Sequence, residues 1–405
     1  MNNEKYIPKI IVNLGLILLF ISTPIRSISE FNHLTDNLFY VGGLLILIIA
    51  ISSLIEKDIL MNNSFKITTL IYGVFILAVI VSTFVNGNLE SEIFSFERFI
   101  LIYFFLAVCL TLTNVINEGM IIRSFIISSG IIFIYFLIEY PISETPAESY
   151  KGGFYNPNSV GVLAVTLFSV SIAAGTSLLK NKQRYILAFI YLLIALGAGY
   201  LTLISNSRTS FMTIVIVFVI IFVTFVYDVL KTRNLLSWKS VLIITLLALG
   251  GMSLFILINN PVYAVLESTV LDKFTRKIEA GSLTAGRAAI WKPIIEDAGL
   301  FGKGGGYFSK ISGLGAHNSF LHVLSFYGWF AAVVYAVFWL AMLIKSIHHY
   351  LTTKLTHTYA ILPFILIVNY ISISMMENMT IHVSAFLAIS MIAIFNKPKE
   401  QSMKV

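Results

Sequence analysis

Apolar runs, each long enough to cross a membrane, dominate this chain and leave few ways for it to fold. A run of roughly 18 or more apolar residues spans about 30 Å of hydrocarbon as an α-helix, and such runs recur throughout the 405 residues. Hydrophobic residues make up 58% of the chain and charged residues 12%, too little polar surface to cover a water-soluble globule. A segment in lipid must satisfy its own backbone hydrogen bonds, so even β-branched runs are expected to be helical. The sequence therefore predicts an all-α, polytopic integral membrane protein.

The apolar runs predict twelve transmembrane helices within a single membrane domain, 1–405. The longest polar interruption, 260–318, is expected to form one large extracytoplasmic loop within that domain. The predicted spans are 10–28, 37–55, 65–85, 99–116, 121–140, 159–179, 185–204, 211–230, 240–259, 319–344, 359–376 and 380–395.

The basic residues predict the orientation of these helices. An even number of spans places both termini on one side, and most of the 27 Lys and Arg residues fall on that side, Lys180 and Lys182 among them. Cytoplasmic connections are enriched in Lys and Arg, whereas long translocated loops are largely exempt from this rule. Both termini are therefore expected in the cytoplasm. The net charge of +7 is explained by orientation, and no nucleic acid partner is expected. The single cysteine, Cys109, allows no internal disulfide.

The polar segment contains a predicted amphipathic helix and a glycine cluster. Five apolar residues share one face at helical spacing, Ile290, Trp291, Ile294, Ile295 and Ala298. Pro293 is expected to kink this helix or to mark its start, and the helix packs either on the membrane surface or on a substrate. The glycines at 302–306 lack the Lys-Ser/Thr pair of a P-loop. They predict a flexible segment whose backbone approaches a ligand, with a plain linker as the alternative.

Two arginines on the predicted external side are candidate anion-binding residues. Arg208 stands at a predicted helix start among serine and threonine hydroxyls, and Arg287 precedes the amphipathic helix. A guanidinium binds phosphate oxygens through two parallel hydrogen bonds, so two arginines that converge would suit a pyrophosphate. The alternatives are an Arg208 side chain that reaches the lipid headgroups and an Arg287 that is a solvated loop charge.

His317 is the candidate general base. It precedes the apolar run 319–344, and the N-terminus of a helix disfavours a positive charge, so the ring is expected to be neutral and able to accept a proton. His322 lies five residues further on and therefore on another face, which argues against a metal site formed by both histidines. The alternative is that His317 only caps the helix.

Three further polar residues lie beside predicted spans. Glu377 is a candidate functional residue because an ionisable group at such a position is costly. Asn156 and Asn158 flank a proline in an external turn whose aromatic residues suit sugar faces, or belong to an interfacial aromatic belt.

Several short motifs follow one another around the large loop. They are Asn156-Pro157-Asn158, Ser207-Arg208-Thr209-Ser210, Gly286-Arg287 with Trp291, Gly302-Lys303-Gly304 with Phe308, and His317-Asn318-Ser319-Phe320 with Tyr327-Gly328. Their order and placement over residues 150–345 resemble the O-antigen ligase and Wzy-type O-antigen polymerase superfamily. The first 150 residues carry almost none of this resemblance.

The resemblance implies a C-type membrane glycosyltransferase that needs no metal and no other cofactor. It implies transfer of a glycan from undecaprenyl pyrophosphate to an acceptor hydroxyl outside the bacterial cytoplasmic (inner) membrane. It also implies that Arg208 and Arg287 hold the donor pyrophosphate and that His317 assists the acceptor. The further candidate substrate contacts are Asn156, Asn158, Trp291, Asn318 and Glu377.

The expected function is polymerisation of undecaprenyl-pyrophosphate-linked oligosaccharide repeat units into O-antigen, capsule or exopolysaccharide. The alternative is an O-antigen ligase that moves finished glycan to the lipid A core or another surface acceptor. A transporter of lipid-linked sugar is disfavoured, because the halves of the sequence show no repeat. The expected partners are the lipid-linked glycan donor, the glycan acceptor, membrane lipids, a chain-length regulator and a flippase.

Overall fold

The chain is all-α over the residues that its computed structural model describes. These are residues 6–28, 30–55, 63–87, 116–142, 149–179, 184–232, 287–308, 315–379 and 383–395. Five helices in these ranges are long and apolar enough to cross a membrane. The predicted spans 99–116 and 240–259 lie outside the described residues, as does the loop before Arg287.

The other ten predicted spans each coincide with a helix, with ends that differ by a few residues except at α14, which continues nine residues beyond the predicted end at 344. These helices are α1 (Tyr6–Ile25), α2 (Thr35–Ile55), α3 (Asn63–Asn86), α5 (Glu118–Glu139), α6 (Pro157–Leu178), α7 (Tyr185–Ile204), α8 (Arg208–Thr232), α14 (Ser319–Thr353), α15 (Leu362–Ser374) and α16 (Val383–Phe395). A short 3-10 helix, η2 (Asn32–Leu34), and α12 (Ala288–Asp297) complete the set.

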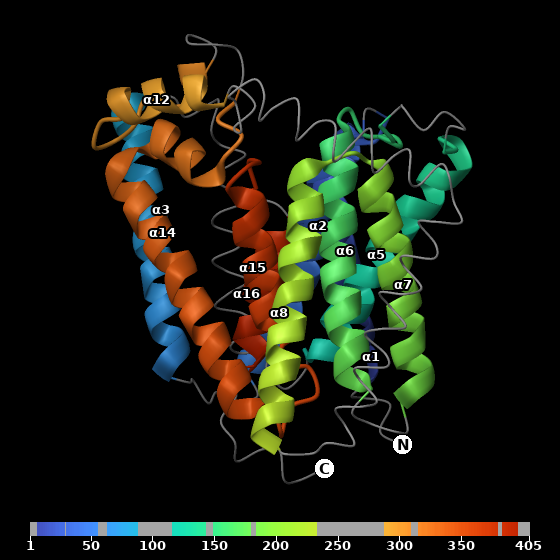
Figure 1. Ribbon diagram of the computed structural model, residues 1–405. Helices are drawn as coiled ribbons and strands as arrows, with labels where there is room; N and C mark the ends of the chain where they lie inside the picture. Colours follow the sequence, from blue (N-terminus) through green and yellow to red (C-terminus); the bar gives the residue numbers. More distant parts are fainter. Residues whose placement is uncertain are drawn as a thin grey trace.

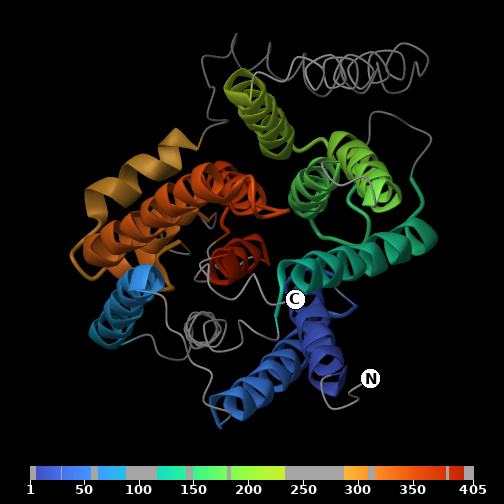
Figure 2. The same ribbon diagram turned by 90° about the horizontal axis from the view of Figure 1, so that it is seen from below.

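The central helices are α15 and α16, and the other long helices stand around them (Figure 1; Figure 2). α6 packs beside α15, and the fully buried Asn369 joins the two helices. Its amide nitrogen donates to the hydroxyl of Ser169 at 2.8 Å and to the carbonyl of Val165 at 3.2 Å. Interhelical hydrogen bonds of this kind hold helices together in lipid, where apolar burial provides little driving force.

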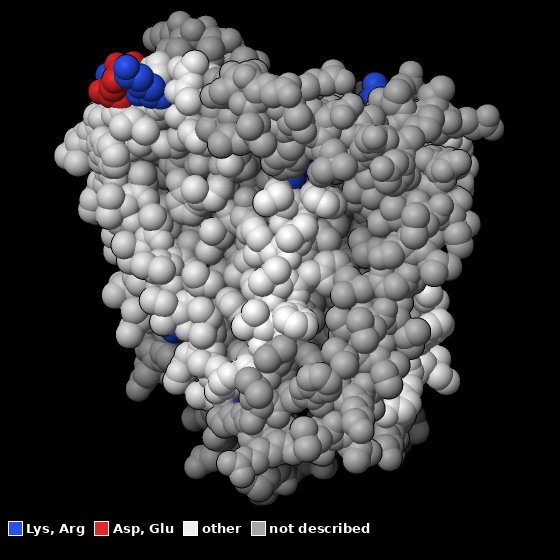
Figure 3. Space-filling view, in the orientation of Figure 1, with Lys and Arg blue, Asp and Glu red and all other residues white. Residues whose placement is uncertain are grey.

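The surface has the character that a membrane-embedded bundle requires. On the face shown in Figure 3, most of the described charged side chains gather over α12 at one end, while the described side chains below are almost all uncharged. Large apolar side chains such as Leu196, Phe222 and Val333 are exposed on the helix surfaces, each by half or more. In water such a surface would drive aggregation, whereas lipid tails solvate it without cost.

Asparagines begin two of the helices that carry motif residues. The side chain of Asn156 accepts from the N–H of Asn158 at the start of α6, where Pro157 occupies the first turn. The side chain of Asn318 accepts from the N–H groups of Phe320 and Leu321 at the start of α14. Each cap satisfies N–H groups that have no partner within the helix, and a proline in the first turn loses no hydrogen bond.

α14 is broken at Gly328, where the sequence predicts a continuous span. The first part runs beneath α12 and the second part descends beside α3 (Figure 1). Gly328 has φ 85° and ψ −179°, which interrupts the helical hydrogen bonds. The segment after α12 replaces them, because the N–H of Lys303 donates to the carbonyl of Ser325 at 2.8 Å, and the N–H of Trp329 donates to the carbonyl of Gly299 at 3.1 Å.

The glycine cluster makes this close contact of two backbone segments possible. Gly302 and Gly304 have positive φ angles of 72° and 71°. A Cβ atom on Gly302 would lie 2.4 Å from the carbonyl oxygen of Phe326. The hydroxyl of Ser82 on α3 donates to the carbonyl of Phe301 at 2.6 Å and fixes the segment from the other side. The glycines thus serve an approach of backbone to backbone, where we expected an approach to a ligand.

α12 forms as predicted from its apolar face, but it begins before Pro293. The helix starts at Ala288 and continues through the proline, so the expectation that Pro293 marks its start is wrong. A proline removes one helical hydrogen bond, and packing of the apolar face offsets that loss. The buried Ile294 packs in a small second core with Tyr307, Phe308, Ala316 and Leu324.

Tyrosine hydroxyls donate to carboxylates at two places near helix ends and tie neighbouring elements together. The hydroxyl of Tyr307 donates to Asp297 at 3.0 Å, and burial together with this bond raises the pKa of Tyr307 to about 12. The hydroxyls of Tyr135 and Tyr140 donate to Glu30 at 2.5 Å and 2.7 Å. These two hydrogen bonds, that of Tyr135 first, lower the pKa of the Glu30 carboxyl. They attach the connection after α1 to the end of α5.

The close contact predicts that Gly302→Ala and Gly328→Ala each destabilise the protein. A Cβ atom on Gly328 would lie 2.2 Å from the carbonyl oxygen of Leu300, and both positions have positive φ. Backbone strain of this kind costs about 1–3 kcal/mol. Thermal unfolding of the purified protein in detergent should show a lower midpoint for both variants. The control is Gly299→Ala, which adds a methyl group in open space; equal midpoints for all three variants would contradict the contact.

Candidate functional site

A cavity of about 290 Å³ lies at the end of the bundle where α1 ends and α14 begins. Its walls come from the last turn of α1, the turn before α6, the residues that precede α14 and the turn between α15 and α16. Four polar side chains that the sequence singled out line this cavity, Asn156, Asn158, His317 and Glu377. The site is therefore assembled from parts of the chain that are far apart in sequence.

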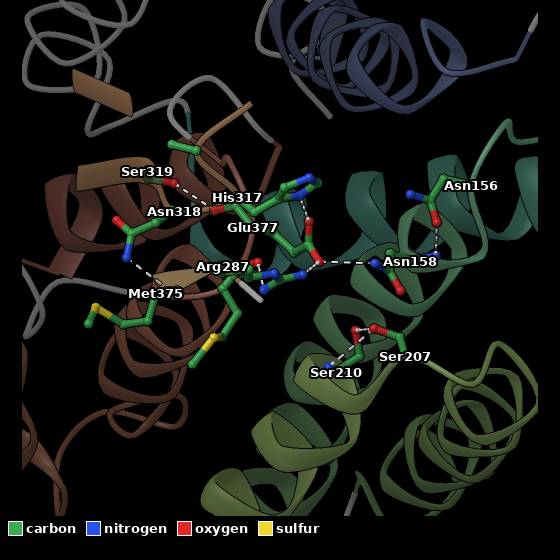
Figure 4. A network of polar contacts seen from close by, with 12 residues as sticks. Asn156, Asn158, Ser207, Ser210, Arg287, His317, Asn318, Ser319, Met375 and Glu377 are labelled. Carbon is green, nitrogen blue, oxygen red and sulfur yellow. Dashed lines mark hydrogen bonds and ion pairs between the residues drawn. The ribbon is translucent and has the colours of Figure 1, made fainter. Parts of the chain in front are cut away.

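The carboxylate of Glu377 is the centre of the polar contacts (Figure 4). Its side chain is only 11% exposed. Its Oε1 accepts from Nη2 of Arg287 at 3.2 Å and from Nδ2 of Asn158 at 3.0 Å, and its Oε2 lies 3.4 Å from Nδ1 of His317. A carboxylate with so little water around it is stable in its charged form only where hydrogen bonds and a cation replace the water.

Arg287 supplies that cation. It occupies the position just before α12, its side chain is 19% exposed, and its Nη1 donates to the carbonyl of Met376 while its Nη2 pairs with Glu377. The reading of Arg287 as a solvated loop charge is therefore wrong. A guanidinium carries five N–H donors, so these two contacts leave the remaining donors for another ligand.

His317 faces Glu377 but does not cap α14. Its φ angle is 47°, a left-handed conformation that a non-glycine residue adopts at a cost of about 1–3 kcal/mol. Asn318 is the cap, so the alternative that His317 only caps the helix is wrong. The preference of helix starts for asparagine over histidine is visible in the sequence and could have made this assignment. The strained conformation turns the imidazole towards the cavity.

The neighbours of His317 hold it from both sides. The indole nitrogen of Trp291 donates to the carbonyl of Ala316 at 2.8 Å, which fixes the residue before the histidine to α12. On the other side, Nδ2 of Asn318 donates to the carbonyl of Met375 at 3.0 Å. Both residues were candidate substrate contacts, and in the structure each makes a contact that positions the site.

Ser319 fastens the turn that carries Glu377. Its buried hydroxyl donates to the carbonyl of Glu377 at 3.1 Å and accepts from the N–H of Met379 at 2.6 Å. One side chain thereby fixes both flanks of the turn between α15 and α16 on the start of α14. The sequence analysis gave Ser319 no separate role.

The contact between His317 and Glu377 selects one form of the imidazole. A proton on Nδ1 is shared with the carboxylate, which leaves the lone pair of Nε2 free to accept a proton from another molecule. A carboxylate that orients a histidine in this way is the arrangement that general-base sites use. The positions of Asn158 and Arg287 keep the carboxylate in place while it does so.

Asn156 lines the cavity with an amide nitrogen that makes no hydrogen bond to the described residues. Its oxygen caps α6, so the nitrogen is the part that remains available. The expectation that Asn156 and Asn158 lie at the site agrees with this placement. Asn158 reaches Glu377 directly, whereas Asn156 faces only the cavity.

Arg208 stands apart from the Glu377 cluster. α8 begins at Arg208, as the sequence predicts, and a Cβ atom on Gly161 of α6 would lie 2.5 Å from Ser207. The start of α8 therefore packs one helical turn below Asn158. The Arg208 guanidinium makes no hydrogen bond or ion pair within the described parts of the chain. The convergence of Arg208 and Arg287 on one ligand stays a prediction.

The last turn of α1 contributes residues that the sequence analysis missed. Thr23, Pro24 and Ser27 line the same cavity as His317. The backbone of the turn before α6 holds this end of α1, because the N–H of Tyr155 donates to the carbonyl of Ser27 at 3.1 Å. No motif marks these residues, and only the polar positions at the end of an otherwise apolar run could have drawn attention to them.

No group of three or more His, Cys, Asp or Glu side chains in the described ranges could hold a metal ion. In comparisons with known proteins, no family model matches the chain, and no curated protein matches it.

The geometry predicts energetic coupling between Arg287 and Glu377. Arg287→Ala and Glu377→Ala should each lower stability by about 1–3 kcal/mol, because each leaves a poorly hydrated partner unsatisfied. The double variant should cost less than the sum, by about 0.5–3 kcal/mol. Unfolding midpoints in detergent give these values.

The matched control is the exposed pair Lys292–Glu296, whose atoms lie 3.8 Å apart. Exposed pairs contribute about 0–1 kcal/mol, so the Lys292→Ala and Glu296→Ala effects should be small. Coupling at Arg287–Glu377 no larger than at this pair would contradict the central role of Glu377.

Proposed function

We propose that this protein is a membrane glycosyltransferase that polymerises undecaprenyl-pyrophosphate-linked oligosaccharide repeat units into a surface polysaccharide. The observation that carries the proposal is the oriented His317–Glu377 pair at the edge of a cavity, with Arg287 on the same carboxylate. A proton acceptor beside a cation is the combination that glycosyl transfer from a pyrophosphate requires. The order of the short motifs supports the same family of reactions.

In the proposed reaction, an acceptor hydroxyl attacks the anomeric carbon of the donor sugar. The hydroxyl proton passes to Nε2 of His317, and a bond forms between the acceptor oxygen and the anomeric carbon. The bond from that carbon to the pyrophosphate oxygen breaks, and the pyrophosphate leaves with the electron pair. Glu377 stabilises the imidazolium that forms, since the charge develops next to its carboxylate.

The arginines serve the leaving pyrophosphate. Arg287 offers the N–H donors that Met376 and Glu377 leave unused, and Arg208 is available at the start of α8. Negative charge grows on the pyrophosphate as its bond to carbon breaks, so guanidinium groups placed beforehand lower the barrier. The isoprenoid tail of the donor fits the apolar surface between helices, which the membrane lipids also contact.

The proposal includes the finer points of membrane topology. The chain crosses the bacterial cytoplasmic membrane twelve times, both termini lie in the cytoplasm, and the segment 260–318 with the site lies outside. A flippase that delivers the donor and a chain-length regulator are the proposed protein partners. The distribution of basic residues supports this orientation.

Cysteine labelling tests the orientation. In a Cys109→Ser background, a cysteine at Glu296 on α12 should react with an impermeant thiol reagent added to intact cells. A cysteine at Thr356, exposed between α14 and α15, should react only after the membrane is opened. The reverse pattern would place the site in the cytoplasm, where the proposed reaction does not occur.

The proposed reaction predicts that His317→Ala and His317→Asn lose about 100- to 10,000-fold in turnover, the contribution of a positioned base. The measurement uses purified protein with a lipid-pyrophosphate-linked repeat unit as both donor and acceptor. Donor binding should be retained, since the arginines remain. The control is His348→Ala, an exposed histidine near the far end of α14.

The products separate the possible outcomes. A ladder of lengthening chains supports a polymerase, whereas transfer only to a lipid A core or another surface acceptor identifies the alternative, a ligase. Near-normal turnover of His317→Asn would remove the base from the mechanism.

A further inference from the structure

We propose that the cavity beside His317 binds the acceptor sugar and that it selects a neutral sugar over an anionic one. This inference rests on the proposed function and names the class of acceptor that the site takes. It follows from the charge, the unused polar groups and the size of the cavity.

The described residues that line the cavity include one carboxylate, that of Glu377, and no Lys or Arg side chain. Arg287 approaches Glu377 through the other carboxylate oxygen from the one that His317 faces. Neither Arg26, next in sequence to the cavity wall, nor Arg287 is among the lining residues. An anion in the cavity would therefore meet the Oε2 side of the Glu377 carboxylate, while the cation of that pair lies on the Oε1 side, and this arrangement disfavours its binding.

This charge pattern also divides the site between the two substrates. A pyrophosphate carries more negative charge than any sugar, so it belongs on the side of Arg287 and not in the cavity. His317 faces the cavity, and the acceptor is the substrate that gives up a proton. The cavity is accordingly the acceptor side, and the Glu377 carboxylate lies between the two halves.

The unused polar groups suit the hydroxyls of a sugar. The side-chain hydroxyls of Thr23 and Ser27 and the amide nitrogen of Asn156 make no hydrogen bond to the described residues. They are neutral donors and acceptors on one side of the cavity, with Pro24 and Phe154 supplying apolar surface beside them. Small-ligand sites combine apolar walls with a few polar groups that fix orientation.

The size limits what enters. Ligand pockets span roughly 300–1,000 Å³, and this cavity of about 290 Å³ lies at the lower end. It fits the terminal sugar of an acceptor, while the rest of the glycan extends outside. Selection therefore acts on the one residue whose hydroxyl is next to His317.

The test measures binding of monosaccharide probes to the purified full-length protein by saturation-transfer NMR. The neutral probes are the methyl glycosides of glucose, galactose and N-acetylglucosamine, and the anionic probes are the methyl glycosides of glucuronic and galacturonic acid. At least one neutral probe should bind, with the uronic acid of matching stereochemistry about 10- to 100-fold weaker. Filling the cavity with Ser27→Trp should abolish the signal, and Thr356→Trp at the other end of the protein should not.

A variant that gains binding of the anionic probe provides a sharper test. Ser27→Lys adds a cation to the lining of the cavity that Glu377 also lines, so binding of the uronic acid should rise to equal or exceed that of the neutral probe. Thr356→Lys adds the same charge at the far end and should leave the preference unchanged. A variant that merely misfolds would lose both probes and could not produce this reversal.

The inference is overturned if the uronic acid binds the wild-type protein as tightly as its neutral counterpart. It is also overturned if no neutral probe binds, or if Ser27→Trp leaves binding intact. These outcomes are separate from the fate of the proposed function, which turns on transfer from the lipid pyrophosphate donor. Transfer without the predicted sugar preference would support the proposed polymerase function and would rule out selection of a neutral acceptor sugar by the cavity.

Discussion

The site depends on the cost of keeping one carboxylate away from water. Glu377 lies in a turn between two apolar helices, and its charge is tolerable only because Arg287, Asn158 and the imidazole of His317 surround it. Each partner comes from a different part of the chain, so satisfying one charge fixes the relative positions of α6, α12, α14 and α15. Within the described parts of the chain, the same contacts leave the other ring nitrogen of His317 without a partner. A single set of hydrogen bonds thus stabilises the buried charge and orients the imidazole.

The helices could be predicted from the sequence because each apolar run in lipid must satisfy its own backbone, whatever its neighbours do. Ten predicted spans coincide with helices for that reason. The break at Gly328 could not be predicted in this way, since it is permitted only by backbone groups of residues 299–304 that lie elsewhere in the chain. Gly328 permits a break because glycine tolerates a positive φ angle. The break forms only because the segment 299–304 packs against this part of α14.

The residues of the candidate site could be predicted from the sequence, whereas the contacts between them could not. His317, Arg287, Asn158 and Glu377 stand out in sequence because polar groups next to apolar runs are costly. That Glu377 contacts the other three is a property of the fold (Figure 4), as is the presence of Thr23 and Ser27 in the lining of the same cavity. Trp291 and Asn318 were expected to touch a substrate, yet they hold backbone carbonyls beside His317. Sequence spacing does not distinguish a side chain that binds a ligand from one that holds a ligand-binding residue in position.

The cavity brings the end of the first helix against the turn before the last one, and this has a consequence for biosynthesis. α1 enters the bilayer at the beginning of translation, but the wall that faces it, with Glu377 and Met379, is synthesised nearly at the end. Until then Glu377 can neither pair with the guanidinium of Arg287 nor orient the imidazole of His317. The cavity and its polar contacts are therefore completed only when the final pair of helices has entered the bundle.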